Sequence, residues 1–330
     1  MIRAISTPSI ALIKYWGNRN EELRLPAADS LAITLDQPSV EVVLEDADVF
    51  SACSFDVRGT ERILSEKEIA RLRGHFEVAK KYVSEKGWIN ELPEFVAIEI
   101  RSKIPQSIGL ASSSAVFSAL AEGYAVYVPG ISRQDISVIA RLGSGSASRS
   151  VYGGFVAMVA GEGGEIGASY AEQIADERHW QLHDVIIVPT HDEKKTGSTE
   201  GHALAGTSPL FEKRLREMPR RQEECINAIM RKDFALLQRV SEEDCMDMHA
   251  VMQTSVPPLN YLSDETYRIV DEIKKLREAE NINVLYTMDA GPTVHLICDD
   301  EALPRVRSFA AIQKGCTVFE AGVGGGSRIV

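Results

Sequence analysis

Residues 104–115 are the stretch of this chain best suited to binding an anion. They read IPQSIGLASSSA and run directly into apolar residues, as a loop does before it enters a helix. The free N–H groups and the dipole at a helix start attract anions, and serine hydroxyls can contact phosphate oxygens or a bound Mg²⁺. No Gly-Lys-Ser/Thr follows, so this is not a Walker loop, and a plain helix N-cap carries equal weight.

Two basic residues stand in settings that are unusual for surface cations. Lys14 lies within the apolar run ALIKYWGN, where it can snorkel at a strand end or hold a developing negative charge in a pocket. Arg149 follows the small residues SGSAS, around which the backbone could wrap an anion that the guanidinium grips in bidentate fashion. A flexible loop with a surface arginine is the alternative for Arg149.

Asp289, in the segment MDAGP, is the candidate general base. The same segment is also an ordinary turn sequence, so a turn-forming carboxylate is the alternative. Residues 194–199 (KKTGST) could form a basic lid over phosphates, although a solvated loop is commoner. His249 is expected to pack or cap rather than catalyse, and the closing glycine-rich residues 322–327 to form a flexible or closely packed turn.

Composition sets the broad class of the protein. The chain has 330 residues, 44% of them hydrophobic and 25% charged, which is enough to bury a core in one large or, better, two domains. The net charge of −12 argues against a general nucleic-acid or anionic-membrane surface. The first residues lack the apolar run of a signal peptide, and the five cysteines show no metal-type spacing, so we expect a cytoplasmic protein with reduced thiols.

Hydrophobic periodicity predicts a mixed order of strands and helices. Because strands and helices do not alternate regularly, the expected fold class is α+β, with a domain boundary near residue 180. Strands are predicted at 39–44, 95–100, 153–159, 185–188, 283–288 and 294–298, and helices at 66–86, from the serine loop to 127, 133–142, 211–231, 234–252 and 264–279.

The order of these motifs resembles a known family. The serine loop resembles the ATP motif of the GHMP small-molecule kinase superfamily, and the segments around Lys14, Arg149 and Asp289 resemble the signatures of mevalonate diphosphate decarboxylases. The resemblance implies a two-domain GHMP-kinase fold, with a ribosomal protein S5 domain 2-like ATP-binding domain at 1–182 and a ferredoxin-like domain at 183–330. It also implies ATP and Mg²⁺ as cofactors, a phosphorylated mevalonate as substrate, no nucleic-acid or membrane partner, and a homodimer.

Roles follow from the resemblance residue by residue. Asp289 would orient or deprotonate the tertiary 3-hydroxyl, Lys14 would neutralise the transferring phosphoryl group, and Arg149 would clamp the carboxylate that leaves as CO₂. The nucleotide would lie on Gly109, Leu110, Ala111, Ser112, Ser113 and Ser114, with Ser113 also on the metal. The substrate would contact Tyr15, Asn18, Ser144, Gly145, Ser146, Arg149 and Ser198.

Two positions depart from the family pattern. Asn18 stands where the family usually has a lysine that contacts the diphosphate, and Asp29 where a neutral serine is expected. Losing a charge-assisted contact costs on the order of 1.5–3 kcal/mol, so we expect mevalonate 5-phosphate as the substrate and isopentenyl phosphate as the product. The diphosphate, with isopentenyl diphosphate as product, is the alternative, because Arg19 could restore the charge. A 3-kinase and a non-catalytic ligand-binding regulator are more distant alternatives.

Overall fold

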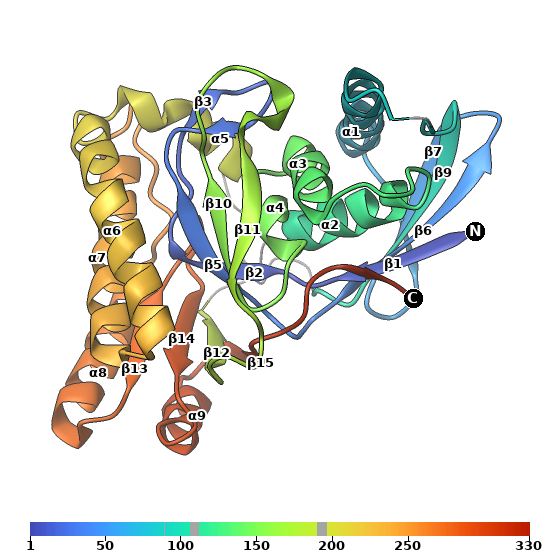
Figure 1. Cartoon of the computed structure of the whole chain (residues 1–330). Coiled ribbons are helices and arrows are strands. Elements are labelled where there is room, and N and C mark those ends of the chain that lie inside the picture. Colours follow the sequence, from blue (N-terminus) through green and yellow to red (C-terminus); the bar gives the residue numbers. More distant parts are fainter. Residues whose placement is uncertain (89, 106–111, 190–196) are drawn as a thin grey trace.

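The computed structural model describes residues 1–88, 90–105, 112–189 and 197–330. Its N-terminal half contains two sheets and a short hairpin (Figure 1). The six-stranded sheet has the order β16 (Arg328–Ile329), β1 (Ile2–Ser6), β6 (Val40–Ala47), β9 (Phe95–Ser102), β7 (Ser51–Phe55) and β8 (Glu61–Arg62). The first four-stranded sheet has the order β11 (Tyr170–Ala175), β10 (Phe155–Val159), β5 (Ser30–Thr34) and β2 (Ser9–Ile13), and the hairpin pairs β3 (Asn18–Asn20) with β4 (Leu25–Pro26).

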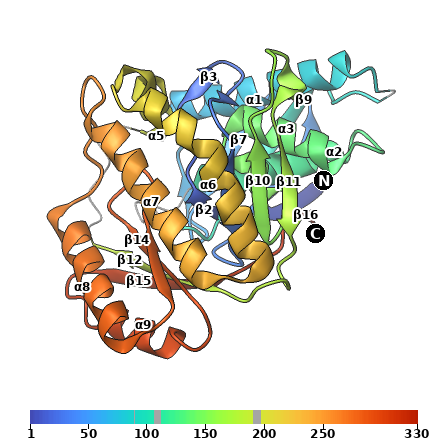
Figure 2. The ribbon, with the colours of Figure 1, turned by 60° about the vertical axis from the view of Figure 1, so that its left-hand side comes forward.

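The C-terminal half has a four-stranded antiparallel sheet covered by helices (Figure 2). The order of this sheet is β13 (Val284–Thr287), β14 (Val294–Cys298), β12 (His183–Val188) and β15 (Thr317–Gly322). The helices described for the whole chain are α1 (Glu66–Glu85), α2 (Ser112–Ala125), α3 (Arg133–Gly143), α4 (Ala147–Ser150), α5 (Ser198–Leu204), α6 (Phe211–Arg231), α7 (Phe234–Gln253), α8 (Asp264–Glu280) and α9 (Leu303–Ala311), with 3₁₀ turns at Ile166–Ala168 and Ala205–Thr207.

Helices pack on the sheets of the N-terminal half and also join the two halves of the molecule. Helix α2 packs on β1 and β6, and α3 and α4 pack on the sheet that contains β2 and β10. The other side of that sheet meets the antiparallel pair α6 and α7, and α7 also packs on β13. One hydrophobic cluster therefore includes residues from both halves, among them Leu12, Phe155, Leu237 and Leu285.

The fold class predicted from the sequence is confirmed as α+β, and most predicted elements are present. Helices α1, α6, α7 and α8 begin and end within a few residues of the predicted bounds. Gly87, which follows the predicted helix 66–86, has φ of 68°, which is the left-handed conformation that ends many helices. The division at residues 182 and 183 stays a prediction, although it falls directly before β12.

The glycine-rich C-terminal turn is closely packed rather than flexible. The Gly324 N–H donates to the Thr34 carbonyl at 2.8 Å. A Cβ added at Gly326 would lie 2.2 Å from the Val151 carbonyl oxygen, so this position has no room for a larger residue. The turn leads into β16, which pairs with β1, and the two termini lie side by side in both views (Figures 1 and 2).

Candidate active site

One cavity collects side chains from segments that lie far apart in the sequence. It lies where the loop after β2, the start of α2, the loop between α3 and α4, helix α5 and the β13–β14 loop meet. Nine of the residues predicted from the sequence line it: Lys14, Tyr15, Ser113, Ser144, Gly145, Ser146, Arg149, Ser198 and Asp289.

Lys14 and Asp289 form an ion pair in the wall of this cavity. The Lys14 ammonium Nζ donates to Asp289 Oδ1 at 2.7 Å, and the Lys14 side chain is only 1% exposed, compared with 30% for Asp289. Burial favours the neutral carboxyl, but Lys14, His295 and Arg149 outweigh it and hold the pKa of Asp289 below its ordinary value. Asp289 is therefore ionised at neutral pH and can accept a hydrogen bond from a substrate hydroxyl through its exposed edge.

Arg149 presents an incompletely paired guanidinium to the same space. One of its terminal nitrogens donates to the Ser30 hydroxyl, while its buried Nε has no hydrogen-bond partner among the described residues. Burial lowers the pKa of Arg149 to about 10, so the group remains a cation at neutral pH. Beside it, the hydroxyls of Ser113 and Ser144 lie 3.1 Å apart and those of Ser144 and Ser146 3.3 Å apart, which makes a row of neutral donors.

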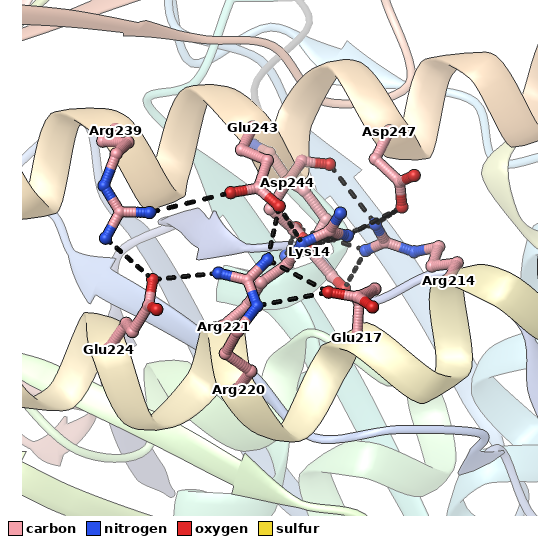
Figure 3. A network of polar contacts seen from close by, with 10 residues as sticks. All are labelled: Lys14, Arg214, Glu217, Arg220, Arg221, Glu224, Arg239, Glu243, Asp244 and Asp247. Atoms are coloured by element: carbon pink, nitrogen blue, oxygen red, sulfur yellow. Dashed lines mark hydrogen bonds and ion pairs between the residues drawn. The ribbon is translucent and has the colours of Figure 1, made fainter.

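The backbone of Lys14 is held by helices α6 and α7 (Figure 3). Because β2 ends at Ile13, the next peptide has no strand partner, and the Lys14 N–H instead donates to Asp244 Oδ2 at 2.6 Å. Arg214 donates to the Lys14 carbonyl at 3.1 Å and to Asp244 Oδ1 at 2.9 Å, and both side chains are at most 1% exposed. The buried pair thus fixes the direction in which Lys14 leaves the strand.

Helix α5 is docked on the loop after β2 through His202 and Gly201. The ring of His202 lies 4.2 Å from that of Tyr15 and 4.6 Å from that of Trp16, and its Nδ1 accepts the Gly17 N–H at 3.0 Å. A Cβ on Gly201 would lie 2.5 Å from the Trp16 ring, so only glycine permits this approach. The docking places Ser198, the first residue of α5, at the cavity.

Some predicted site residues lie elsewhere or cannot be located. Gly109, Leu110 and Ala111 lie outside the described residues, as do residues 194–196 of the predicted basic lid at 194–199. Ser112 is exposed at the start of α2, whereas Ser114 is buried and is not among the residues that line the cavity. Asn18 accepts from the Tyr15 hydroxyl and donates to Glu21 at 2.8 Å outside the lining, so its substrate contact stays a prediction.

Among the further residues that line the cavity, Arg24, Arg71 and His202 have polar side chains that sequence reasoning missed. Arg24 lies in the turn between β3 and β4. Arg71 lies on the amphipathic helix α1, far in the sequence from every predicted motif. Neither has a local pattern that separates it from a surface arginine, and only the tertiary fold brings them to the site. His202 follows Gly201 within α5, and the glycine inside a helix was the available signal.

Three histidines, His75, His202 and His249, make stability depend on pH. Burial lowers the pKa of His75 and His249 to about 4 and that of His202 to about 3, whereas the unfolded chain has values near 6.5. Between these values the unfolded chain binds more protons, so stability should fall as the pH drops from 7 to 5, by on the order of 1–2 kcal/mol for each histidine. Urea unfolding at the two pH values measures this, and the His75→Phe variant should show a smaller difference than the parent protein. An equal difference would contradict the assignment.

Among the described residues, no group of three or more His, Cys, Asp and Glu side chains could enclose a metal ion. The hydroxyl of Ser113 lines the cavity close to Ser144 and fits the oxygen ligands that Mg²⁺ prefers. Within the part of the chain that the structure describes, no helix has the length and apolar character needed to cross a membrane.

The two-domain α+β fold with this cavity defines the chain as a GHMP-kinase-like protein. A family profile described as the diphosphomevalonate decarboxylase-like N-terminal domain matches residues 6–171, and the mevalonate 5-diphosphate decarboxylase C-terminal domain matches 184–318. The chain belongs to the diphosphomevalonate decarboxylase family.

Individual relatives agree with this assignment. Diphosphomevalonate decarboxylase from Debaryomyces hansenii is 35% identical over 307 residues, covering 90% of this chain and 79% of the relative. The human enzyme is 34% identical over 309 residues, covering 89% and 76%. The crystal structure of mevalonate diphosphate decarboxylase from Staphylococcus aureus matches with a TM-score of 0.88 at 29% identity, covering 100% of this chain and 97% of that one. A structure described as MDDEF in complex with MVAPP, AMPPCP and magnesium matches with a TM-score of 0.86 at 28% identity, covering 99% and 98%.

Proposed function

We propose that this protein catalyses the ATP-dependent decarboxylation of mevalonate 5-diphosphate, which yields isopentenyl diphosphate, ADP, phosphate and CO₂. The observation that carries the proposal is the Lys14–Asp289 ion pair beside the partly unpaired guanidinium of Arg149 in one cavity. The family's name and the described complex with MVAPP, AMPPCP and magnesium support both the reaction and its use of ATP and Mg²⁺.

Each of the three residues has a separate task. Asp289 accepts the hydrogen bond of the tertiary 3-hydroxyl and orients its oxygen toward the γ-phosphate of ATP. The Lys14 ammonium stabilises the negative charge on the transferring phosphoryl group. Phosphorylation turns the 3-hydroxyl into a good leaving group. Arg149 holds the substrate carboxylate. As phosphate leaves, the bond to the carboxylate breaks, its electrons form the alkene, and CO₂ departs.

The serines of the cavity fit the phosphate groups of both ATP and the substrate. Ser113 would hold the Mg²⁺ that accompanies ATP, and this ion supplies neutralisation of the phosphate charge. Ser144 and Ser146 offer hydroxyl donors to the substrate phosphates, and Ser198 at the start of α5 offers another. Burial raises the pKa of Tyr15 to about 12, so its phenol remains neutral at the cavity wall.

The monophosphate favoured by the sequence is now the second candidate. That expectation rested on Asn18 and on the extra anion of Asp29, but the Asp29 carboxylate accepts the Ala160 N–H at 2.7 Å and does not line the cavity. Arg19, the residue that could have restored the charge, donates instead to the Ala160 carbonyl at 3.0 Å on the exposed side. The relatives are named for the diphosphate, and this favours the alternative that the sequence had placed second.

Product analysis tests the reaction type. The protein is incubated with MgATP and mevalonate 5-diphosphate, and ADP, CO₂ and the organic product are quantified together. A decarboxylase should release one CO₂ for each ADP and form isopentenyl diphosphate. ADP with a stable 3-phosphate and no CO₂ would make the protein a kinase, and no ADP above background would make it a ligand-binding regulator.

Two finer expectations remain predictions. A homodimer would be detected by light scattering coupled to size exclusion, and a cytoplasmic location by fractionation of the source cells.

A further inference from the structure

Two arginines that no predicted motif contains lie side by side on the cavity wall. Arg24 donates through Nε to the Leu142 carbonyl at 3.1 Å, and Arg71 donates through Nη2 to the Gly143 carbonyl at 2.9 Å. These carbonyls are consecutive and belong to the last turn of α3, directly before Ser144. The free carbonyls of a helix C-terminus thus anchor both guanidinium groups next to each other on the cavity wall.

This end of the cavity has an excess of positive charge. Among its described lining residues, four cations (Lys14, Arg24, Arg71 and Arg149) face a single carboxylate, Asp289, which is already paired with Lys14. The buried Nε of Arg71 has no hydrogen-bond partner among the described residues. Burial and the repulsion of the neighbouring Arg24 guanidinium lower the pKa of Arg71 to about 10, so Arg71 remains a cation at neutral pH.

The cations fall into two sets. Lys14 pairs with Asp289 at 2.7 Å and Arg149 donates to the Ser30 hydroxyl, and these two cations form the first set. Arg24 and Arg71 form the second set, because both are held by the consecutive carbonyls at the end of α3. The first set surrounds the point where phosphoryl transfer and decarboxylation are proposed. The second set therefore faces a different part of the same ligand, and a group with two or more negative charges would relieve its repulsion.

The hairpin that carries Arg24 also carries Asn18, at the position where the family usually has a lysine. The Asn18 amide is engaged by Tyr15 and Glu21, so it offers little to a phosphate. Arg24 directly precedes β4, the other strand of the same hairpin, and has φ of 50°. Its side chain lines the cavity.

We infer that Arg24, together with Arg71, binds the terminal phosphate of the substrate and is the residue that makes this chain select the diphosphate over the monophosphate. The inference rests on the proposed function and adds the residue that supplies its specificity. The forked guanidinium provides two parallel N–H donors, which match the oxygens of a terminal phosphate.

The test compares two substrates on one variant. Arg24→Asn removes the guanidinium and keeps a residue that readily adopts the left-handed conformation, so the turn should persist. Its kcat/KM for mevalonate 5-diphosphate should fall on the order of 10- to 100-fold, because a charge-assisted contact is lost. The value for mevalonate 5-phosphate should change by less than about threefold. Where the monophosphate is not turned over, its inhibition constant replaces kcat/KM.

Matched variants separate recognition from structure. Arg19→Gln removes an exposed cation from the same hairpin and should leave kcat/KM unchanged for both substrates. Asn18→Lys in the Arg24→Asn background returns a cation to the hairpin and should restore a large part of the diphosphate activity.

The inference and the proposed function fail in different ways. A wild-type protein that prefers the monophosphate would overturn the proposed function. An equal loss on both substrates in Arg24→Asn, or no loss on the diphosphate, would overturn the role of Arg24. The role of Arg24 is judged by the ratio of kcat/KM for the two substrates. A general loss of folding or of turnover lowers both values and therefore does not change this ratio.

Discussion

Replacing Asp289 by asparagine should slow ADP release by about a thousandfold, since positioned acid–base groups contribute about 10²–10⁴ to rate. The asparagine keeps the shape and still offers an oxygen to Lys14 Nζ, which lies 2.7 Å from Asp289 Oδ1. It lacks the negative charge that orients and accepts from the substrate hydroxyl. Steady-state ADP release with saturating ATP and mevalonate 5-diphosphate measures the effect.

The same variant needs a check on folding, because the buried Lys14 ammonium loses its counter-charge. Asp289→Asn should still bind ATP and unfold cooperatively, which nucleotide titration and thermal melting establish. If it binds ATP and turns over at the normal rate, Asp289 has no part in the reaction. If it no longer folds, Asp289→Glu keeps the charge and should fold, with slow turnover because the carboxylate is displaced.

Removing Arg214 should give the largest loss of stability expected for a single substitution here. Arg214→Met leaves the Asp244 carboxylate, which is fully buried, without the guanidinium that pairs with both of its oxygens. Breaking one partner of a buried pair costs about 3–5 kcal/mol. Urea unfolding of the variant and of the parent protein gives the difference in free energy directly.

Figure 3 also supplies the control for that prediction, since the same two helices carry an exposed ion pair. Arg239 is 55% exposed and lies 3.1 Å from Glu224, so Arg239→Gln should cost at most about 1 kcal/mol. A second variant, Arg214→Lys, keeps the charge but cannot bridge Asp244 and the Lys14 carbonyl together. It should fold, with reduced kcat because Lys14 is held less firmly. Equal losses of stability for Arg214→Met and Arg239→Gln would contradict the account.

Local sequence predicted the elements well, and it pointed to the three residues to which we assign roles in the reaction. The long amphipathic helices and the apolar strands have periods that tertiary contacts reinforce rather than override, so their bounds could be predicted closely. Lys14, Arg149 and Asp289 were recognisable because each stands in a segment whose residue types are unusual for an ordinary loop. The structure brings all three to one cavity.

What local sequence could not predict depends on contacts between distant residues. Asp244 reaches the Lys14 N–H across 230 positions, and Arg71 reaches the Gly143 carbonyl across 72. The partner of Asp29 was equally hidden, since its carboxylate accepts the N–H of Ala160 rather than facing the substrate. Neighbouring residues alone therefore suggest that Asp29 adds a negative charge at the substrate, although Asp29 does not line the cavity, and they give no sign of the cations Arg24 and Arg71.

The charge of the cavity differs from the net charge of the chain, because the fold brings cations from distant segments together. The chain carries a net charge of −12, yet the described lining of its cavity has four cations and one carboxylate. Desolvation strengthens the interaction of these cations with a phosphorylated ligand. Net charge alone thus says little about the ligand of an enclosed site.

The most direct test of the proposed function is the ratio of kcat/KM for mevalonate 5-diphosphate to that for mevalonate 5-phosphate, measured on the wild-type protein with MgATP and with CO₂ release as the readout. A terminal phosphate bound by additional cations should make this ratio at least about 10. A ratio of one or less, or ADP release without CO₂, would contradict the account.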